Sequence, residues 1–296
     1  PGILFQKRTM KYRFIDTHQH LWPVEGLCAL LQLSRSAYYR WRQLGPSMRE
    51  QRNRALLPLV EEIHRQSRRT YGSPRIWEAL CQRGIRCGRH RIARLMRFYG
   101  IRAKTKRRFK VTTRSGHTQT TVPDLVQRDF NAQRPNQVWT SDITYIWTRE
   151  GWAYLAVVLD LCSRMIVGWE LSARLTASLV TSAVHRALRW RTPSSGLVLH
   201  SDRGSQYASN ELLELSKEHG IRLSMSRTGN CYDNAVTESF FHTFKTEHVF
   251  FSRFETRQDA RTSIFDYIEV FYNRQRMHST IRNLSPMQYE QQLDHP

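Results

Sequence analysis

Residues 200–207, HSDRGSQY, and residues 226–245, SRTGNCYDNAVTESFFHTFK, contain two of the three acidic residues that indicate the fold of this chain. Asp202 follows an apolar run, and Glu238 lies in a helical pattern, with 35 residues between the two. Upstream, Asp142 lies in the alternating segment VWTSDITYIW (138–147), which predicts a strand. Three carboxylates on separate elements can hold a pair of Mg²⁺ ions, with Mn²⁺ as a substitute, while phosphate oxygens complete the coordination. Two such ions about 3.5–4 Å apart clamp the attacking and leaving oxygens of a phosphoryl transfer, so we expect these three residues to be the catalytic metal ligands.

The pattern around these carboxylates predicts an RNase H-like fold. Three closely spaced strand-like segments, the first of which contains Asp142, suggest an antiparallel meander. Alternation places Asp142 on one face with Val138, Thr140, Thr144 and Ile146, so its charge must be exposed or bind something. Two further short strands and three helices follow, with the helices at 176–191, 209–219 and 234–249. We therefore expect an α/β domain with a mixed sheet, helices on both faces, and Asp202 at a strand end where ligands gather.

The last of these helices carries a second candidate residue. Glu238, His242 and Lys245 are spaced i, i+4 and i+7, so they share one face. From that face Lys245 could hold a DNA phosphate, and the alternative is a solvated helix lysine. His242 is interpreted as structural. Asp233 and Asn234 are expected to cap the helix.

Several other residues near these motifs have two possible roles. Arg203, Gln206 and Tyr207 follow Asp202 so closely that they either contact DNA or brace the site. Asp160, in VVLDLCSR, is interpreted as a turn residue in preference to a fourth metal ligand. Residues 225–232, which contain a glycine, are expected to form a mobile loop beside the site.

The net positive charge of the chain lies in its N-terminal part. The formal net charge is +21. Residues 1–116 hold 27 Lys and Arg against 6 Asp and Glu, whereas residues 117–296 hold 19 of each. A basic module joined to a neutral one is expected where the first binds a polyanion and the second carries out chemistry on it, so the predicted partner is double-stranded DNA.

Helical patterns in the basic part predict two DNA-binding modules. Residues 25–43 suggest a helix-turn-helix whose second helix, capped by Ser34, carries the basic residues Arg35, Arg40 and Arg42; the alternative is an ordinary helical hairpin. Residues 49–66 and 74–83 and the run CGRHRIARLMRFYGI (87–101) predict three more helices, the last with the basic residues Arg89, Arg91 and Arg94. The following segment is a basic linker expected to lie along the DNA backbone, with Lys106, Arg107 and Arg108 as candidate contacts; the alternative is a solvated tether.

Three motifs together resemble a known family of enzymes. WTSDITY (139–145), HSDRGSQY (200–207) and SMSRTGNCYDNAVTESFF (224–241), in this order, resemble the catalytic domain of DDE transposases from bacterial insertion sequences, in particular the family of insertion sequence three. The resemblance covers roughly residues 50–290 and includes a later pattern that begins at Tyr272-Asn273, continues through Arg276 and His278, and ends at Pro286. That pattern either packs under the catalytic helix or contacts DNA.

The resemblance implies a transposase with a retroviral-integrase-like core. Such an enzyme binds the terminal repeats of its element, cleaves DNA at the 3′ end with divalent metal, transfers the strand to target DNA, and follows a route through a circular intermediate. A homo-oligomer on DNA and a helix-turn-helix partner from an upstream reading frame are also implied. The expected division is 1–46 helix-turn-helix-like, 47–102 second DNA-binding module, 103–135 linker, 136–250 RNase H-like core and 251–296 helical extension.

Other classes of protein fit the sequence less well. An RNase H-class nuclease without strand transfer and a non-catalytic DNA-binding regulator are the two rival interpretations. Five irregularly spaced cysteines do not suggest a disulfide framework, and zinc held by His18, His20, Cys81 and Cys87 is disfavoured by their spacing. No apolar stretch approaches the length of a membrane span. The resemblance implies a bacterial cytoplasmic protein associated with the nucleoid.

Overall fold

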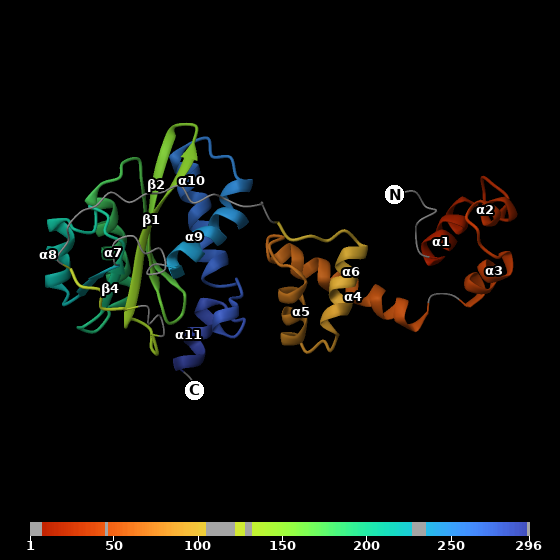
Figure 1. The fold of residues 1–296 in the computed structure, drawn as a ribbon, viewed down its shortest axis with the longest axis horizontal. Helices are drawn as coiled ribbons and strands as arrows, with labels where there is room; N and C mark the ends of the chain where they lie inside the picture. Colours follow the sequence, from red (N-terminus) through yellow and green to blue (C-terminus); the bar gives the residue numbers. More distant parts are fainter. Residues whose placement is uncertain (1–7, 45–46, 105–121, 128–131, 227–234, 295–296) are drawn as a thin grey trace.

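The computed structural model describes residues 8–44, 47–104, 122–127, 132–226 and 235–294, and it consists of a helical N-terminal part followed by a mixed α/β part (Figure 1). Buried apolar side chains among these residues fall into four clusters, two in each part. None of the helices described combines the length and the apolar character needed to cross a bilayer.

The first helical group has its own small core. It consists of α1 (Arg8–His18), α2 (Val24–Leu30) and α3 (Arg35–Leu44). Ile15, Leu31 and Tyr38 are fully buried at its centre. The backbone N–H of Ala37 donates to the hydroxyl of Ser34 over 3.4 Å, in agreement with the predicted cap. The helical pair predicted over 25–43 is therefore confirmed.

The second helical group packs three longer helices around Val60, Ile76, Leu80 and Ile92. These helices are α4 (Met48–Gln66), α5 (Ser73–Gln82) and α6 (Arg89–Phe98). They correspond to the three predicted from apolar spacing, and α5 begins with a proline in its first turn, where the missing N–H costs no helical bond.

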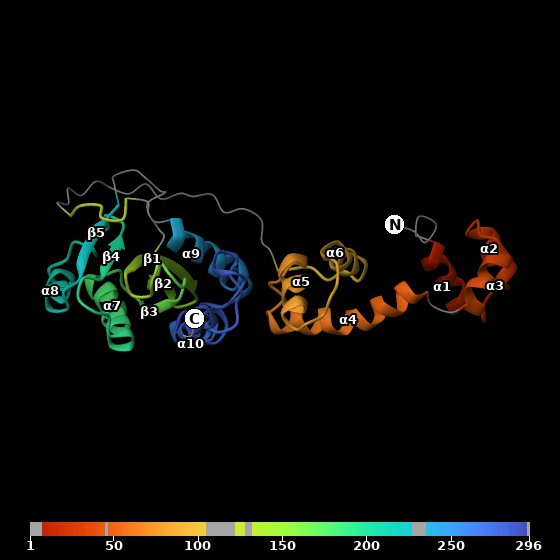
Figure 2. The ribbon, with the colours of Figure 1, turned by 90° about the horizontal axis from the view of Figure 1, so that it is seen from below.

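Tyr71 fastens the second helical group to the α/β part. Its buried hydroxyl accepts a hydrogen bond from the backbone N–H of Met277 over 2.7 Å and donates to the carbonyl oxygen of Gln275 over 3.3 Å. Met277 itself is buried in the core of the helical group. An ion pair between Arg68 and Asp266, 2.5 Å long, joins the same two parts. The two parts therefore share packed, hydrogen-bonded surface, and both views of the ribbon show them side by side (Figure 2).

A five-stranded mixed sheet in the order β3-β2-β1-β4-β5 forms the centre of the α/β part. The strands are β1 (Val138–Thr148), β2 (Gly151–Asp160), β3 (Ile166–Ser172), β4 (Val198–Ser201) and β5 (Arg222–Met225). β1, β2 and β3 are antiparallel neighbours, as the predicted meander requires, whereas β4 runs parallel to β1 and β5 runs parallel to β4. This is the RNase H-like arrangement expected from the order of elements.

Helices cover both faces of the sheet (Figure 2). On one face α7 (Ala177–Arg191) and α8 (Asn210–Glu218) enclose the cluster that contains Trp139, Val158 and Leu199. On the other face α9 (Ala235–Glu247) and α10 (Arg257–Phe265) enclose the cluster that contains Leu155 and Val157. The alternation of buried residues along β2, with even-numbered and odd-numbered positions in different clusters, produces these two cores.

The C-terminal segment differs in one respect from the prediction. Within the helical extension expected over 251–296, α10 is followed by a π-helical segment, η4 (Asp266–Tyr272), and not by further α-helix. The segment buries Tyr267, Ile268, Phe271 and Tyr272, and an α-helix would also bring this spacing to one side, so the sequence pattern does not reveal the wider turn. Two short 3₁₀ turns, η3 (Val249–Phe251) and η5 (Ser279–Ile281), and a final helix, α11 (Pro286–Asp294), complete this segment.

Gly168 on β3 allows α7 to lie close to the sheet. A Cβ atom at this position would lie 2.8 Å from the Cβ of Ala187 and would also collide with the backbone carbonyl of Ala183. We expect Gly168→Ala to lower the free energy of unfolding by about 1–3 kcal/mol, because the helix must move away from the strand. Urea denaturation followed by circular dichroism measures this loss.

Gly26 provides the matched control. It lies inside α2 with no heavy atom within 4 Å of the position of an added Cβ. Gly26→Ala is therefore expected to leave the protein as stable as before or slightly more stable. Equal effects of the two substitutions would contradict the packing argument.

Candidate active site

Asp142 and Asp202 occupy equivalent positions on two neighbouring parallel strands. β4 pairs with β1 over only four residues, and the last pair is Ser141 with Ser201. Asp142 and Asp202 are each the next residue along the chain. Since neighbouring strands lie about 4.8 Å apart, this register brings two residues that are 60 positions apart in sequence to the same edge. Both side chains are only partly accessible.

A buried hydrogen bond joins the helix that carries Glu238 to the strand that carries Asp142. The hydroxyl of Thr237 donates to the hydroxyl of Thr140 over 2.7 Å, and both residues are fully buried. Thr140 is on the same face of β1 as Asp142, as alternation predicts. Glu238 follows Thr237 and is exposed. The helix is held against this face by the buried side chains of Phe240, Phe241 and Phe244.

The three carboxylates influence one another through Asp142. The pKa of Asp142 is raised to about 7, mainly by burial and in addition by the negative charges of Asp202 and Glu238. A hydrogen bond from the N–H of Ile143 (2.7 Å) and the charge of Lys245 act in the opposite direction. Asp142 therefore lies in the combined field of the other two carboxylates.

The two outer carboxylates are less strongly perturbed. Burial raises the pKa of Asp202, and a hydrogen bond of 3.0 Å from the N–H of Gly204 opposes this effect. Partial desolvation raises the pKa of Glu238. No three acidic, histidine or cysteine side chains within the described ranges are already grouped closely enough to hold a metal ion. The three carboxylates thus interact electrostatically, but they are not yet close enough to one another to form a complete metal-binding site.

Lys245 lies on the helix beside Asp142. Its Nζ atom is 4.9 Å from the centre of the Tyr145 ring, at a distance typical of a cation–π interaction. Its charge lowers the pKa of Asp142, while burial lowers the pKa of Lys245 itself. Lys245 is therefore half-buried next to the carboxylates, which distinguishes it from a solvated lysine.

Tyr207 braces the two strands from within. Its fully buried hydroxyl shares a 3.0 Å hydrogen bond with the hydroxyl of Ser141, which donates to the carbonyl oxygen of Val157 over 2.8 Å. Burial and the charges of Asp142 and Asp202 raise the pKa of Tyr207 well above its ordinary value. Of its two predicted roles, bracing the site is the one that these contacts support. The Ser141 contact could not be recognised from the sequence, because it depends on strand register.

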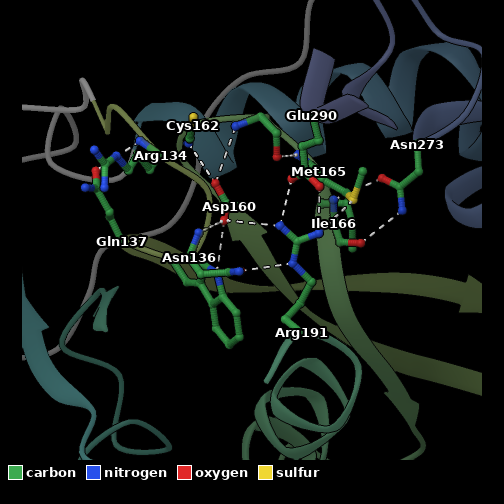
Figure 3. Close-up of polar contacts among 12 residues, drawn as sticks. Arg134, Asn136, Gln137, Asp160, Cys162, Met165, Ile166, Arg191, Asn273 and Glu290 are labelled. Atoms are coloured by element: carbon green, nitrogen blue, oxygen red, sulfur yellow. Dashed lines mark hydrogen bonds and ion pairs between the residues drawn. The ribbon is translucent and has the colours of Figure 1, made fainter. Parts of the chain in front are cut away.

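Asp160 has the turn position that the sequence suggested (Figure 3). It is fully buried, and its carboxylate accepts hydrogen bonds from the N–H of Asn136 (2.6 Å), the indole of Trp139 (3.2 Å) and the N–H of Cys162 (2.8 Å). Arg191 links this group to the C-terminal helix by a two-point ion pair with Glu290 at 2.6 and 2.8 Å. With these partners Asp160 holds together the start of β1, the end of β2 and the C-terminal helix.

The candidate DNA contacts of the N-terminal part occupy exposed or half-exposed helix surfaces. Arg35 and Arg42 are exposed but form ion pairs with Glu25 (2.9 Å) and Asp16 (3.6 Å). Of the remaining candidates on α3 and α6, three are exposed, namely Arg40, Arg89 and Arg94. The fourth, Arg91, is half-buried. DNA contact by any of these residues stays a prediction.

Some predictions fall on residues that the structure does not describe. Lys106, Arg107 and Arg108 lie outside the described residues, as do the capping pair Asp233 and Asn234 and most of the expected loop at 225–232. Arg203 is described and is half-buried, and its Nε atom donates to the carbonyl oxygen of Ser226 over 2.8 Å. This contact fastens Arg203 to the end of β5, beside Asp202.

Comparisons with known proteins agree with this architecture. A family model described as "Integrase core domain" matches residues 132–231, a second with the same description matches 238–293, and one described as "HTH-like domain" matches 50–109. An "uncharacterized 31 kDa protein" of insertion element IS600 from Shigella sonnei is 43% identical over 265 residues, which are 90% of this chain and 97% of the relative. The transposase InsF for insertion sequence IS3A from Escherichia coli strain K12 is 40% identical over 283 residues, or 95% and 98% of the two chains.

Solved structures with similar folds are more distant. The catalytic core domain of HTLV-2 integrase in complex with magnesium is 15% identical and has a TM-score of 0.43, covering 54% of this chain and 99% of that one. A simian T-cell lymphotropic virus intasome in complex with a PP2A regulatory subunit is 18% identical with a TM-score of 0.46, covering 78% and 74%.

Proposed function

The chain belongs to the IS3 family of insertion-sequence transposases, and from this premise we propose that it binds the ends of its own element, cleaves DNA and transfers the freed 3′ end to a second DNA. The observation that carries the proposal is the placement of Asp142. Asp142 on β1 and Asp202 directly after β4 follow the last residue pair of two adjacent parallel strands, and burial together with the charges of Asp202 and Glu238 raises the pKa of Asp142 to about 7. Crowded carboxylates of this kind are found where a cation is to be bound.

The residues present fit Mg²⁺ or Mn²⁺. All three donors are carboxylates, which hard divalent cations prefer, and the mutual repulsion at Asp142 is what a cation would relieve. Asp142 and Asp202 would hold one ion, and Asp142 and Glu238 the other. When bound, the pair would supply stabilisation of the attacking and leaving oxygens. The two-ion arrangement is part of the proposal, because the carboxylates described here must still approach each other to complete it.

The protein's own side chains have the task of positioning DNA. Lys245 would hold a DNA phosphate near the reacting bond, and its half-buried position beside Asp142 supports this role. Tyr207 and Ser141 tie the segment that follows β4 to β1, and Thr237 ties the helix that carries Glu238 to β1. Water would cleave the first phosphodiester and free the 3′-OH, which would then attack a phosphodiester of the second DNA and so exchange one phosphodiester bond for another; neither step requires ATP or a covalent protein intermediate.

The N-terminal modules would bind the terminal repeats. The division proposed is 1–46, 47–102, 103–135, 136–250 and 251–296, and the two helical groups with separate cores support the first two units. The match of residues 50–109 to an HTH-like domain supports DNA binding by the second. A homo-oligomer on DNA and a partner from the upstream reading frame complete the proposal.

Metal removal and a joining assay test this function. With Mg²⁺ and DNA that ends in the element's own terminal repeat, the full chain is expected to nick the 3′ end and join it to target DNA, and EDTA should abolish both steps. DNA supplied with a pre-cut 3′-OH end should still be joined. A nuclease of the RNase H class would instead cut without joining, and a regulator would bind DNA without changing it.

A further inference from the structure

A pocket of about 270 Å³ lies on the side of α9 away from Glu238. Its walls come from α5 of the second helical group, the turn between β2 and β3, α9 itself, and the segment that follows η4. Three arginines from three of these elements line it: Arg75, Arg164 and Arg276. The described residues that line this pocket include no carboxylate. The remaining lining is mainly hydroxyl and aromatic, so the pocket is positively charged and rich in hydrogen-bond donors.

Arg276 forms the base of the pocket. Its guanidinium is buried and donates to both carboxylate oxygens of Glu247, each over 2.7 Å. The Glu247 carboxylate also lies 3.5 Å from Arg75. One carboxylate therefore faces two guanidinium groups, which leaves an excess of positive charge at the base.

The pKa of His278 is affected by this excess positive charge. Its Nε2 atom lies 3.3 Å from the Nη1 atom of Arg276 and so accepts from it in the neutral state. Burial lowers the pKa of His278 well below its ordinary value, and the positive charges of Arg276, Arg75 and Arg164 lower it further. The three arginines therefore act on the same point in the pocket.

Arg164 is held in an unusual conformation at the opposite wall. Its φ angle is 64°, in the left-handed region that residues with a side chain rarely adopt. Its Nη1 atom is buried, and no hydrogen-bond partner for this atom is found in the part of the chain that the structure describes. Strained residues and buried unsatisfied donors are concentrated at binding sites, where a ligand supplies the missing acceptor.

We propose that this pocket binds one phosphodiester of the DNA backbone, with Arg164 and Arg75 as the charged donors and the exposed hydroxyls of Ser239 and Thr280 at its rim. Guanidinium groups bind phosphate oxygens at two points, which suits a pocket with a free Nη1 position. The bound phosphate would lie outside the reacting bond, because Glu238 is on another side of the helix.

The position of the pocket favours DNA over a free anion. Arg75 belongs to the helical group that matches an HTH-like domain, whereas Ser239 lies next to Glu238 in sequence. A duplex that contacts both the helical group and the carboxylates must pass the place where these parts meet. The inference rests on the proposed function, since it assumes that both parts contact the same DNA. It also assigns a role to the segment from Arg276 to Thr280, for which the sequence left packing and DNA contact as alternatives.

Arg164→Asn tests the proposal, since asparagine tolerates a left-handed backbone and removes only the charge. With the full chain and a duplex that carries the element's terminal repeat, the variant should bind roughly three- to tenfold more weakly. The slope of log K against log salt should fall by about 1. Arg164→Lys, which keeps the charge, should retain most of the slope. Arg189→Gln removes an exposed charge from α7, on the opposite face of the sheet, and should change neither quantity.

A second measurement locates the contact and identifies the anion. Single methylphosphonate substitutions along the duplex should reveal one phosphate whose neutralisation weakens binding by the wild type but not by Arg164→Asn. Thr280→Asp, an exposed substitution that adds a carboxylate at the rim, should weaken binding even if Arg164→Asn is too unstable to measure. The proposal would be overturned if both variants bound DNA with unchanged affinity and unchanged salt slope. It would also be overturned if the pocket bound inorganic phosphate and the variants abolished that binding without changing the affinity for DNA. Cleavage that persists in such a case would leave the proposed function intact, so the two failures are distinguishable.

Discussion

Asp142→Asn should reduce DNA cleavage and strand transfer by at least about a thousandfold, which corresponds to about 4 kcal/mol of transition-state stabilisation. The same substitution should make the metal-free protein more stable at neutral and alkaline pH. Both effects have one cause. Asp142 is largely desolvated and is repelled by the charges of Asp202 and Glu238, so its negative charge is costly without a cation, yet that charge is what would bind the cation.

The dependence on pH follows from the direction of the shift. Asp142 has a pKa of about 7 in the folded protein and an ordinary value of 3.8. Between these values the folded state keeps a proton that the unfolded state has lost, so the stability of the wild type falls as pH rises from about 4 to about 7. Above pH 7 the penalty is constant, and it amounts to at most about 4 kcal/mol for a shift of this size.

Thermal denaturation in EDTA at pH 5 and pH 8 measures this difference. Asp142→Asn should melt above the wild type at pH 8, by a larger margin than at pH 5, and Mg²⁺ should stabilise the wild type more than the variant. Glu214→Gln, an exposed carboxylate on α8, should behave like the wild type in every condition. A variant that is less stable than the wild type at pH 8, or one that still cleaves DNA, would show that Asp142 has been assigned the wrong role.

Arg276→Ala should lower the free energy of unfolding by about 3–5 kcal/mol, because it leaves Glu247 with a largely buried negative charge. Arg75 lies 3.5 Å from the same carboxylate, but its own charge is partly desolvated, so it compensates only in part. The loss should appear in urea denaturation as a lower midpoint with an unchanged slope.

Two companion variants separate loss of the ion pair from loss of side-chain volume. Arg274→Ala removes an exposed arginine two residues away and should cost little. Combining Arg276→Met with Glu247→Leu removes both charges and should recover much of the stability. If Arg276→Ala were no more harmful than Arg274→Ala, the buried pair would contribute little to the fold.

The sequence predicted the sheet and the position of Asp142 because alternation in 138–147 has a period that only a strand can satisfy. It could not predict that Ser141 pairs with Ser201, since the register of distant parallel strands is set by tertiary packing. The π-helical segment Asp266–Tyr272 was missed because its residues also fit an α-helix. Arg164 was missed because a single arginine in a turn has no periodic pattern, and its strain is visible only in the backbone angle.

The clamp made by Tyr71 has a consequence for where the DNA is cut. Since its hydroxyl bonds to the backbone on both sides of Arg276, the second helical group cannot swing freely relative to the helix that carries Glu238. If that group recognises the terminal repeat, then the protein itself fixes the number of base pairs between the recognised sequence and the cleaved phosphodiester. Terminal repeats lengthened by one base pair between these two points should therefore be bound normally and cut one nucleotide away from the natural end.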